Sequence, residues 1–276
     1  MSSARPHPHR RIRLAAVAGL VSSLTATLVA APSAQAATRQ QVVRDAAAYA
    51  RSLGYHIGIT VIDTTTRTSY VSGDYDGTFA SESVVKVFIA SRLIVDGEMS
   101  GDIERMAYQM ITQSNDNMAN ALYGLVGGDS LIDWVRSYFH LPNLGTSPNW
   151  PGWWGDTHLR PLVLARFYTR VKRDHPQIAE WLLNAMHHAT TYGADGTYQF
   201  FGLPSATPHA AVKQGWGGGY GDWPGTAGFN TTGFVDGDRY VVVILARGPS
   251  GDYGHPIASM LTHIARLILP GGRFPA

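Results

Sequence analysis

The chain has no cysteine. It therefore cannot use a thiol nucleophile, close a disulfide, hold a metal through thiolates or carry a lipid on an N-terminal cysteine. Charged residues are also scarce, at 15% of the sequence, whereas apolar residues make up 45%. This balance is typical of a folded globular protein and argues against a disordered one. Any catalysis has to use hydroxyl, carboxylate, amine or imidazole groups.

The N-terminal end has no acidic residue and reads as an export signal. Residues 1–36 combine a basic start, an apolar stretch diluted by Ser and Thr, and a small-residue cleavage site: Arg5, Arg10, Arg11 and Arg13, then Leu14 to Ala30, then Ala34-Gln35-Ala36. This order predicts a cleaved signal peptide and a secreted protein with access to the cell wall. The alternative is an uncleaved membrane anchor, which the short and polar-diluted run disfavours. We expect no stable membrane anchor.

Removal of that signal changes the charge balance. The whole chain has 22 Lys+Arg against 20 Asp+Glu, a net charge of +2. Four arginines leave with residues 1–36, so 18 basic residues remain and the net charge becomes −2. No run of Lys or Arg remains, and we expect no nucleic-acid partner.

The remaining residues, 37–276, are sufficient for one domain of two lobes. Strand-like patterns lie at both ends and a helical block lies between them, which predicts an α+β fold. We expect an α/β lobe formed by 37–80 and 205–276, and a helical lobe formed by 81–204. The expected strands are 56–63, about 69–71, 209–216, 227–235 and 239–246. The expected helices are 40–53, one around Ser83, 102–113, 117–126, 131–139, 161–172, 177–187 and 256–269, and 141–155 is expected to be a loop.

A Ser-x-x-Lys pair, Ser83 and Lys86, opens an apolar segment. We expect Ser81 to cap a helix, which places Ser83 in its first turn. A spacing of three residues then puts the lysine amine beside the serine hydroxyl. In an apolar site the amine can be neutral and accept the serine proton. The alternative is a capped helix with one solvated lysine.

Two further polar elements follow. Ser114-Asn115-Asp116, with Asn120 one turn later, lies at a helix junction, where its groups either face a cleft or simply cap a helix. Lys213-Gln214-Gly215-Trp216 lies on an expected strand. The glycine allows a ligand to approach the strand edge closely. The alternative is an edge-strand lysine that leads into a Gly-rich turn.

Together these elements, in this order, match the motif set of class A β-lactamases and penicillin-binding proteins. The chain resembles that superfamily over about residues 38–270, and it is most similar to class A β-lactamases and their secreted actinobacterial relatives. The resemblance implies a β-lactamase/transpeptidase-like fold with a five-stranded antiparallel sheet, flanking helices and an all-helical lobe.

The resemblance also implies a role for each residue. Ser83 would be acylated, Lys86 would activate it, Ser114 would relay a proton to the leaving nitrogen, and Lys213 would attract a substrate carboxylate. Asp116, Gln214, Gly215 and Trp216 would bind substrate, Asn120 would pin a nearby loop, and the backbone amides of Ser83 and Trp216 would form the oxyanion hole.

Three departures from the family pattern stand out. Asp116 replaces a neutral amide side chain, so it can repel an anionic substrate or require a cationic group on it. Gln214 replaces the usual Thr or Ser. No glutamate occurs between Glu104 and Glu180, and Asp156 is the only acid in the loop where class A enzymes hold their deacylating glutamate. We therefore expect slow deacylation, because loss of a general base typically costs ~10²–10⁴-fold.

The sequence thus predicts a secreted serine hydrolase that forms an acyl-enzyme with β-lactams or D-Ala-type peptidoglycan peptides. It is expected to be a monomer, with a small-molecule or peptide substrate, no cofactor and no metal. The alternative is a weak or inactive binding module on the same scaffold, for cell-wall peptide or a protein partner.

Other motifs receive structural interpretations. Gly128-Asp129-Ser130-Leu131 matches a motif of another serine hydrolase family, but it follows a helix end and is expected to be a helix cap. The scattered histidines lack metal-ligand spacing. The tryptophans of residues 150–154 either line a groove or pack the loop onto the body, and the sequence does not choose between these roles.

Overall fold

A central antiparallel sheet organises the structure, a computed structural model that describes Met1, residues 34–218 and residues 223–275. The strand order is β2-β1-β8-β7-β6. The first strand of this sheet after the helical block, β6, therefore lies at one edge. The strands are β1 (His56–Asp63), β2 (Ser69–Gly73), β6 (Ala211–Gly218), β7 (Thr226–Val235) and β8 (Tyr240–Pro249). Strands from the two ends of the chain meet at the centre, where Ile59 of β1 pairs with Ile244 of β8.

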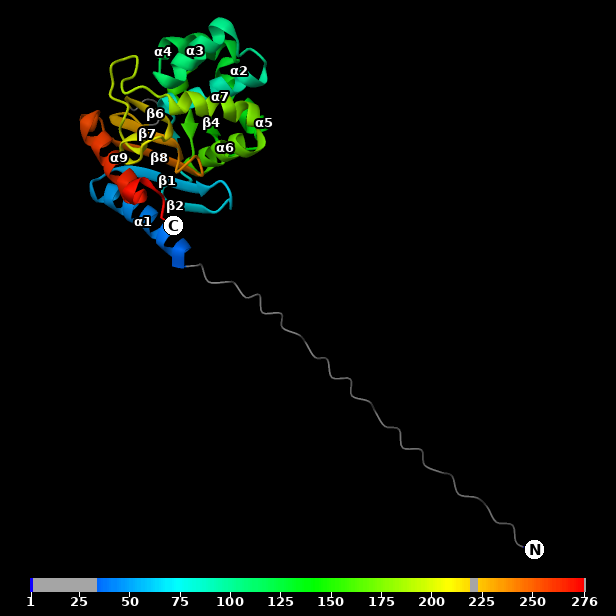
Figure 1. Cartoon of the computed structure of the whole chain (residues 1–276), viewed down its shortest axis with the longest axis vertical. Helices are drawn as coiled ribbons and strands as arrows, with labels where there is room; N and C mark the ends of the chain where they lie inside the picture. Colours follow the sequence, from blue (N-terminus) through cyan, green and yellow to red (C-terminus); the bar gives the residue numbers. More distant parts are fainter. Residues whose placement is uncertain (2–33, 219–222, 276) are drawn as a thin grey trace. The chain divides into compact units, whose positions relative to one another are not determined.

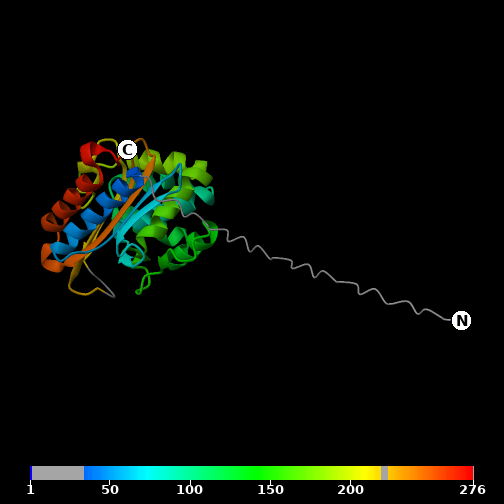
Figure 2. The same ribbon diagram turned by 90° about the horizontal axis from the view of Figure 1, so that it is seen from below.

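The sheet is covered on both faces because its central strands are apolar on both faces. Successive residues of β8 alternate between two cores: Val242 and Ile244 belong to one, and Val243 and Leu245 to the other. The first core is shared with α1 (Ala34–Ser52) and α9 (His255–Ile268), and the second with α6 (Pro161–Asp174). Figure 2 shows these helices on opposite sides of the strands. Alternation of side chains along a strand thus joins the two layers into one body.

A helical block, shown in green in Figure 1, supplies most of the second core. It consists of α2 (Lys86–Val95), α3 (Gly101–Thr112), α4 (Asp116–Leu125), α5 (Leu131–Tyr138) and α7 (Pro176–His187). Phe88 of α2, Phe139 and Phe167 of α6 pack edge to face at its centre. Short elements complete the chain: β3 (Phe79–Ala80), β4 (Gly145–Thr146), β5 (His158–Leu159), α8 (Leu203–Ala206) and the 3₁₀ turns η1 (Glu82–Val85), η2 (Gly128–Ser130), η3 (Trp154–Asp156), η4 (Ser250–Asp252) and η5 (Pro270–Gly272).

The predicted α+β class and the five-stranded antiparallel sheet are confirmed. The described residues from Ala34 onward belong to one compact unit. The loop predicted over 141–155 contains β4 and the start of η3, which sequence periodicity did not indicate because both elements are very short. Gly128–Ser130 was expected to be a helix cap; Ser130 is the residue that precedes α5, but its side chain makes no capping hydrogen bond.

The predicted signal peptide falls mainly on residues 2–33, which lie outside the described residues. Its expected cleavage site, Ala34 to Ala36, forms the first residues of α1. Among the described helices, none is both long and apolar enough to cross a membrane.

Candidate active site

The sequence predicted that Ser83 lies in the first turn of an α-helix. In the structure it lies in a 3₁₀ turn instead. The turn is η1, and α2 begins only at Lys86. Ser81 precedes η1, but its side chain makes no capping hydrogen bond. The Ser81 Oγ instead donates to the carbonyls of Trp154 and Gly155. Glu82 has a φ of +47°, a left-handed conformation that is strained for a glutamate. Strain of this kind next to a reactive side chain is typical of functional sites.

Two contacts from outside the turn hold this segment in place. The Asn230 side chain on β7 donates from Nδ2 to the carbonyls of Ala80 and Ser81, at 2.9 and 3.1 Å. The amide of Ser81 donates to the carbonyl of Thr157, at 2.7 Å. Asn230 is 1% exposed, so its bonds are made in the protein interior. The sheet and the loop after Trp154 therefore both fix the position of Ser83.

Lys86 connects the two polar elements predicted from sequence. Its Nζ lies 2.8 Å from Ser83 Oγ, 2.7 Å from the carbonyl oxygen of Ser114 and 2.5 Å from Asp116 Oδ1. The Trp154 ring covers the same ammonium, 4.6 Å from the ring centroid. The lysine side chain has no exposed surface, whereas that of Asp116 is 65% exposed. The predicted Ser83–Lys86 contact is thus present, and Asp116 faces both the amine and the solvent.

Burial lowers the pKa of Lys86 to about 8, mainly because desolvation disfavours the ammonium. The Asp116 carboxylate opposes this by raising the pKa, through its charge and its hydrogen bond. A pKa near 8 leaves a useful fraction of neutral amine close to neutral pH, which is what a general base needs.

Lys213 reaches the same site from the edge strand β6. Its Nζ lies 2.8 Å from Ser114 Oγ and 2.9 Å from the Gln214 carbonyl, and the side chain is 1% exposed. Desolvation, followed by the nearby charge of Lys86, holds the pKa of Lys213 well below its usual value. Ser114 has a φ of +53°, so a second non-glycine residue of the site is strained. The Ser114 Oγ therefore lies between the two amines, and its distance to Lys86 Nζ is 3.5 Å.

The edge of β6 lies directly against the Ser83 turn. A Cβ added to Gly215 would lie 3.0 Å from the Ser81 carbonyl oxygen and 3.2 Å from the Ser83 amide nitrogen. Only glycine allows this approach without displacement. The Gln214 side chain lies elsewhere: its amide is buried and donates to the carbonyls of Gln199 and Phe201. Successive residues of a strand point to opposite faces, which is why Lys213 faces the site and Gln214 does not.

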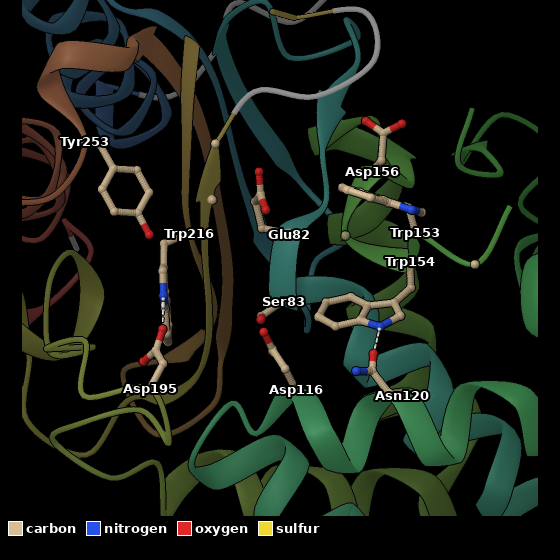
Figure 3. Close-up of a pocket in the computed structure, with 14 residues that line it drawn as sticks. Glu82, Ser83, Asp116, Asn120, Trp153, Trp154, Asp156, Asp195, Trp216 and Tyr253 are labelled. Carbon is tan, nitrogen blue, oxygen red and sulfur yellow. Dashed lines mark hydrogen bonds between the residues drawn. The ribbon is translucent and has the colours of Figure 1, made fainter. Parts of the chain in front are cut away.

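A cleft of ≈ 540 Å³ opens above these groups (Figure 3). Asp195 and Trp216 lie along one side, Asn120 and Trp154 along the other, and Ser83 and Asp116 between them. The described residues that line the cleft are Glu82, Ser83, Asp116, Asn120, Gly152, Trp153, Trp154, Gly155, Asp156, Asp195, Trp216, Gly217, Gly218 and Tyr253. Lys213, Gln214 and Gly215 are not among them.

The loop of residues 141–156 is attached to the site through Trp154. Its indole Nε1 donates to Asn120 Oδ1 at 2.8 Å, so Asn120 contacts the loop as the sequence had suggested. Trp154 both lines the cleft and packs the loop, whereas Trp150 and Trp153 are about half exposed, at 46% and 48%. Asp156 lies at the end of this loop and is 2% exposed.

Sequence reasoning missed two acids of the cleft wall, Glu82 and Asp195, and also the buried Asn230 that holds the Ser83 turn. Glu82 belongs to no motif, because the family pattern places its acidic residue in the loop and not beside Ser83. Asp195 lies in a turn that no motif marks, and its carboxylate accepts from Trp216 Nε1 at 2.9 Å. Asn230 lies in a strand whose pattern signals only burial. For Glu82 the sequence did hold a signal: a glutamate directly before the candidate nucleophile Ser83 is unusual at the start of an apolar segment.

The fold and this constellation define the class: the chain has the fold of the β-lactamases and penicillin-binding proteins. Neither a protein-family model nor a curated protein matches the sequence. A β-lactamase from Chitinophaga pinensis is similar at a TM-score of 0.60 and 18% identity, over 84% of this chain and 98% of that one. A class A β-lactamase from Bacteroides cellulosilyticus is similar at a TM-score of 0.64 and 13% identity, over 83% and 96%.

A penicillin-binding protein, PBP-A, is similar to the same extent. Its TM-score is 0.61 and its identity 17%, over 84% of this chain and 94% of that one. A variant of PBP-A was solved as an acyl-enzyme complex with penicillin G. The predicted superfamily fold is therefore confirmed, while identities this low leave the reaction itself to be argued from the site.

Proposed function

We propose that this protein is a secreted serine hydrolase that forms an acyl-enzyme on Ser83 with β-lactams or D-Ala-type peptidoglycan peptides. One observation carries the proposal: Ser83, Lys86, Ser114 and Lys213 form a continuous chain of hydrogen-bonding groups beneath an open cleft. A buried amine beside a hydroxyl is the arrangement that activates a serine. The structural relatives support the same class of chemistry.

Acylation begins when neutral Lys86 accepts the Ser83 proton. The serine Oγ then forms a bond to the substrate carbonyl carbon, and the carbonyl π electrons move onto its oxygen. The amides of Ser83 and Trp216 would stabilise that oxyanion. The close packing of Gly215 against the Ser83 turn, where an added Cβ would lie 3.2 Å from the Ser83 amide nitrogen, supports this role.

Collapse of the tetrahedral intermediate breaks the carbon–nitrogen bond. The leaving nitrogen takes the Ser114 hydroxyl proton, and Ser114 is reprotonated by Lys86, while Lys213 donates a hydrogen bond to the Ser114 Oγ. Lys86 Nζ, which holds the proton taken from Ser83, lies 3.5 Å from Ser114 Oγ, and Lys213 Nζ lies 2.8 Å from it. With a peptide the products are the acyl-enzyme and a free amine; with a β-lactam the ring opens and the amine remains attached to the acyl group. Protons balance in both cases.

Deacylation requires water to attack the ester carbon, with its proton passing to a base and Ser83 leaving. The cleft offers Asp156 and Glu82 as carboxyl groups near Ser83. Burial, reinforced by the negative charges of Asp156 and Asp116, raises the pKa of Glu82 well above its usual value. A raised pKa favours the protonated glutamate, which cannot accept a proton, and Asp156 is a shorter side chain than glutamate. We therefore propose that the acyl-enzyme is long-lived at neutral pH.

Intact-protein mass spectrometry tests the proposal. The protein lacking residues 1–36 is incubated with benzylpenicillin and, separately, with an uncharged p-nitrophenyl ester. We expect one covalent adduct per chain that persists for hours, and none with Ser83→Ala or Lys86→Ala. Circular dichroism confirms that the variants fold. An adduct that survives Ser83→Ala, or no adduct with either reagent, would contradict the proposed function and favour a binding module.

A further inference from the structure

The wall of the cleft presents acids and no basic side chain in the part of the chain that the structure describes. Four carboxyl groups line it: Glu82, Asp116, Asp156 and Asp195. The two amines of the site, Lys86 and Lys213, are 0% and 1% exposed and do not line it. A substrate that enters the cleft therefore meets carboxyl groups first.

The buried amines offset only part of this negative charge. Lys86 is already paired with Asp116, 2.5 Å away. Lys213, which the sequence suggested as the binding group for a substrate carboxylate, is enclosed, and desolvation lowers its pKa well below the usual value. An enclosed amine whose burial disfavours its charged form attracts an anion weakly. The field in the cleft is then set by the remaining carboxylates.

Asp195 is the carboxylate best placed to bind a ligand. It accepts hydrogen bonds from the Thr197 amide, Thr197 Oγ1 and Trp216 Nε1, at 2.9, 3.0 and 2.9 Å. These bonds outweigh desolvation and lower the pKa of Asp195, so it is ionised at neutral pH. Its turn is closed by a β-bridge between Tyr192 and Tyr198. Asp195 makes no ion pair with any other described residue.

A second observation points independently to a polar ligand. Glu82 is 6% exposed and lines the cleft, and its Oε1 has no hydrogen-bond partner among the described residues. Buried polar atoms nearly always have a partner, so one that lacks it at a cleft wall is a place for a ligand group. The space for this side chain depends on glycines: a Cβ at Gly217 would lie 2.0 Å from Glu82 Oε2, and one at Gly228 would lie 2.9 Å from Oε1.

Aromatic rings supply the rest of the wall. Trp153, Trp154, Trp216 and Tyr253 all line the cleft. Figure 3 shows Trp216 beside Asp195, with Tyr253 on the same side of the cleft. Ring faces attract cations and offer nothing comparable to an anion. A carboxylate held against an indole is a favourable site for an ammonium group.

We propose that the cleft selects acyl donors that carry an ammonium group, which binds at Asp195 and Trp216 while the acyl carbon lies at Ser83. This inference rests on the proposed function, since it names the charge class of the substrate of the same site. By the same geometry, donors that carry a carboxylate and no ammonium group, benzylpenicillin among them, acylate Ser83 more slowly than uncharged donors.

Three p-nitrophenyl esters of equal chain length test the inference. One ends in a trimethylammonium group, one in its uncharged tert-butyl isostere and one in a carboxylate. We expect kcat/KM to fall in that order, with the cation favoured over the isostere on the order of tenfold, which is the strength of a cation–π and carboxylate contact at a partly exposed site. Asp195→Asn should reduce the ratio of cation to isostere to about one, because Asn still accepts from Trp216 but carries no charge.

The matched control is Asp102→Asn, which removes an exposed carboxylate from α3, where it pairs with Arg105. It should leave the ratio of cation to isostere unchanged. The inference would be overturned if both variants changed the ratio of cation to isostere equally, or if the wild type preferred the carboxylate ester. Neither outcome would contradict Ser83-dependent hydrolysis of the esters.

A binding measurement separates this result from failure of the proposed function. If Ser83→Ala hydrolyses the esters as fast as the wild type, the proposed function fails, and the charge preference is judged by titration alone. Tetramethylammonium and neopentyl alcohol are titrated into both the wild type and Asp195→Asn, and tryptophan fluorescence is followed. Saturable binding of the cation that weakens in Asp195→Asn supports the subsite. No difference between the cation and the alcohol overturns it.

Discussion

At the scale of single residues, Lys86 determines how acylation depends on pH. Its ammonium must lose a proton before it can accept one from Ser83, and its pKa is about 8. We expect the rate of acylation to be low at pH 6, to rise through about pH 8 and to level off above it. Stopped-flow kinetics with the uncharged p-nitrophenyl ester would measure this profile. A rate that is independent of pH between 6 and 9 would show that Lys86 is not the base.

Asp116 influences the pH at the midpoint of that profile. Its carboxylate stabilises the Lys86 ammonium and so raises a pKa that burial lowers. Asp116→Asn should therefore shift the midpoint of the profile to lower pH and increase the acylation rate at pH 7. The same change removes a negative charge from the cleft, so labelling by benzylpenicillin should increase more than labelling by the neutral ester. A midpoint that moves to higher pH would contradict this assignment.

Glu82 tests the explanation for slow deacylation. Burial and the neighbouring carboxylates raise its pKa and so favour its protonated form, which is not a base. Glu82→Gln, an uncharged isostere, should leave the lifetime of the acyl-enzyme at pH 7 within about twofold of the wild type. Mass spectrometry of the adduct over time provides the measurement. A lifetime that lengthens on the order of 10²-fold, the typical loss of a general base, would show that ionised Glu82 activates the water.

At the scale of elements, the function depends on how closely β6 approaches the Ser83 turn. Gly215→Ala places a methyl group 3.0 Å from the Ser81 carbonyl oxygen, so the strand and the turn must separate. We expect acylation to slow on the order of 10–100-fold, because small displacements of reacting groups have effects of that size. Gly251→Ala is the matched control, since a Cβ there meets open space. Equal acylation rates in the two variants would contradict the need for this approach.

The loop of residues 141–156 and α4 form a second pair of coupled elements. Trp154 joins them through its bond to Asn120 and also covers Lys86. The loop thereby contributes to the desolvation that lowers the lysine pKa. The reactivity of Ser83 is thus a joint product of α2, α4, β6 and this loop, which are far apart in the sequence.

At the scale of the whole molecule, β8 connects the two hydrophobic cores. Ile244→Ala removes volume from the core under α1 and α9, and Leu245→Ala from the core under α6. Each should lower the free energy of unfolding by about 2–5 kcal/mol. Because neighbouring residues of one strand serve both cores, we expect a single unfolding transition in urea for each variant. Leu53→Ala, at a 51% exposed position, should change stability by less than about 0.5 kcal/mol.

Two separate transitions in either variant would show that the layers unfold independently. Acylation at saturating ester concentration should be retained in both core variants below their transitions, because neither residue lies at the cleft. This distinguishes loss of stability from loss of catalytic geometry.

Local pattern alone determined the α+β class, the order of the elements and the Ser83–Lys86 contact. Each depends on short-range periodicity or on a spacing of three residues, which the backbone converts directly into proximity. Only the tertiary structure decided that Gln214 turns away from the cleft, that Lys213 is enclosed, and that Glu82 and Asp195 line the wall. These outcomes depend on burial and on contacts between distant segments, because a pKa and a charge environment are properties of packed neighbours and not of position along the chain.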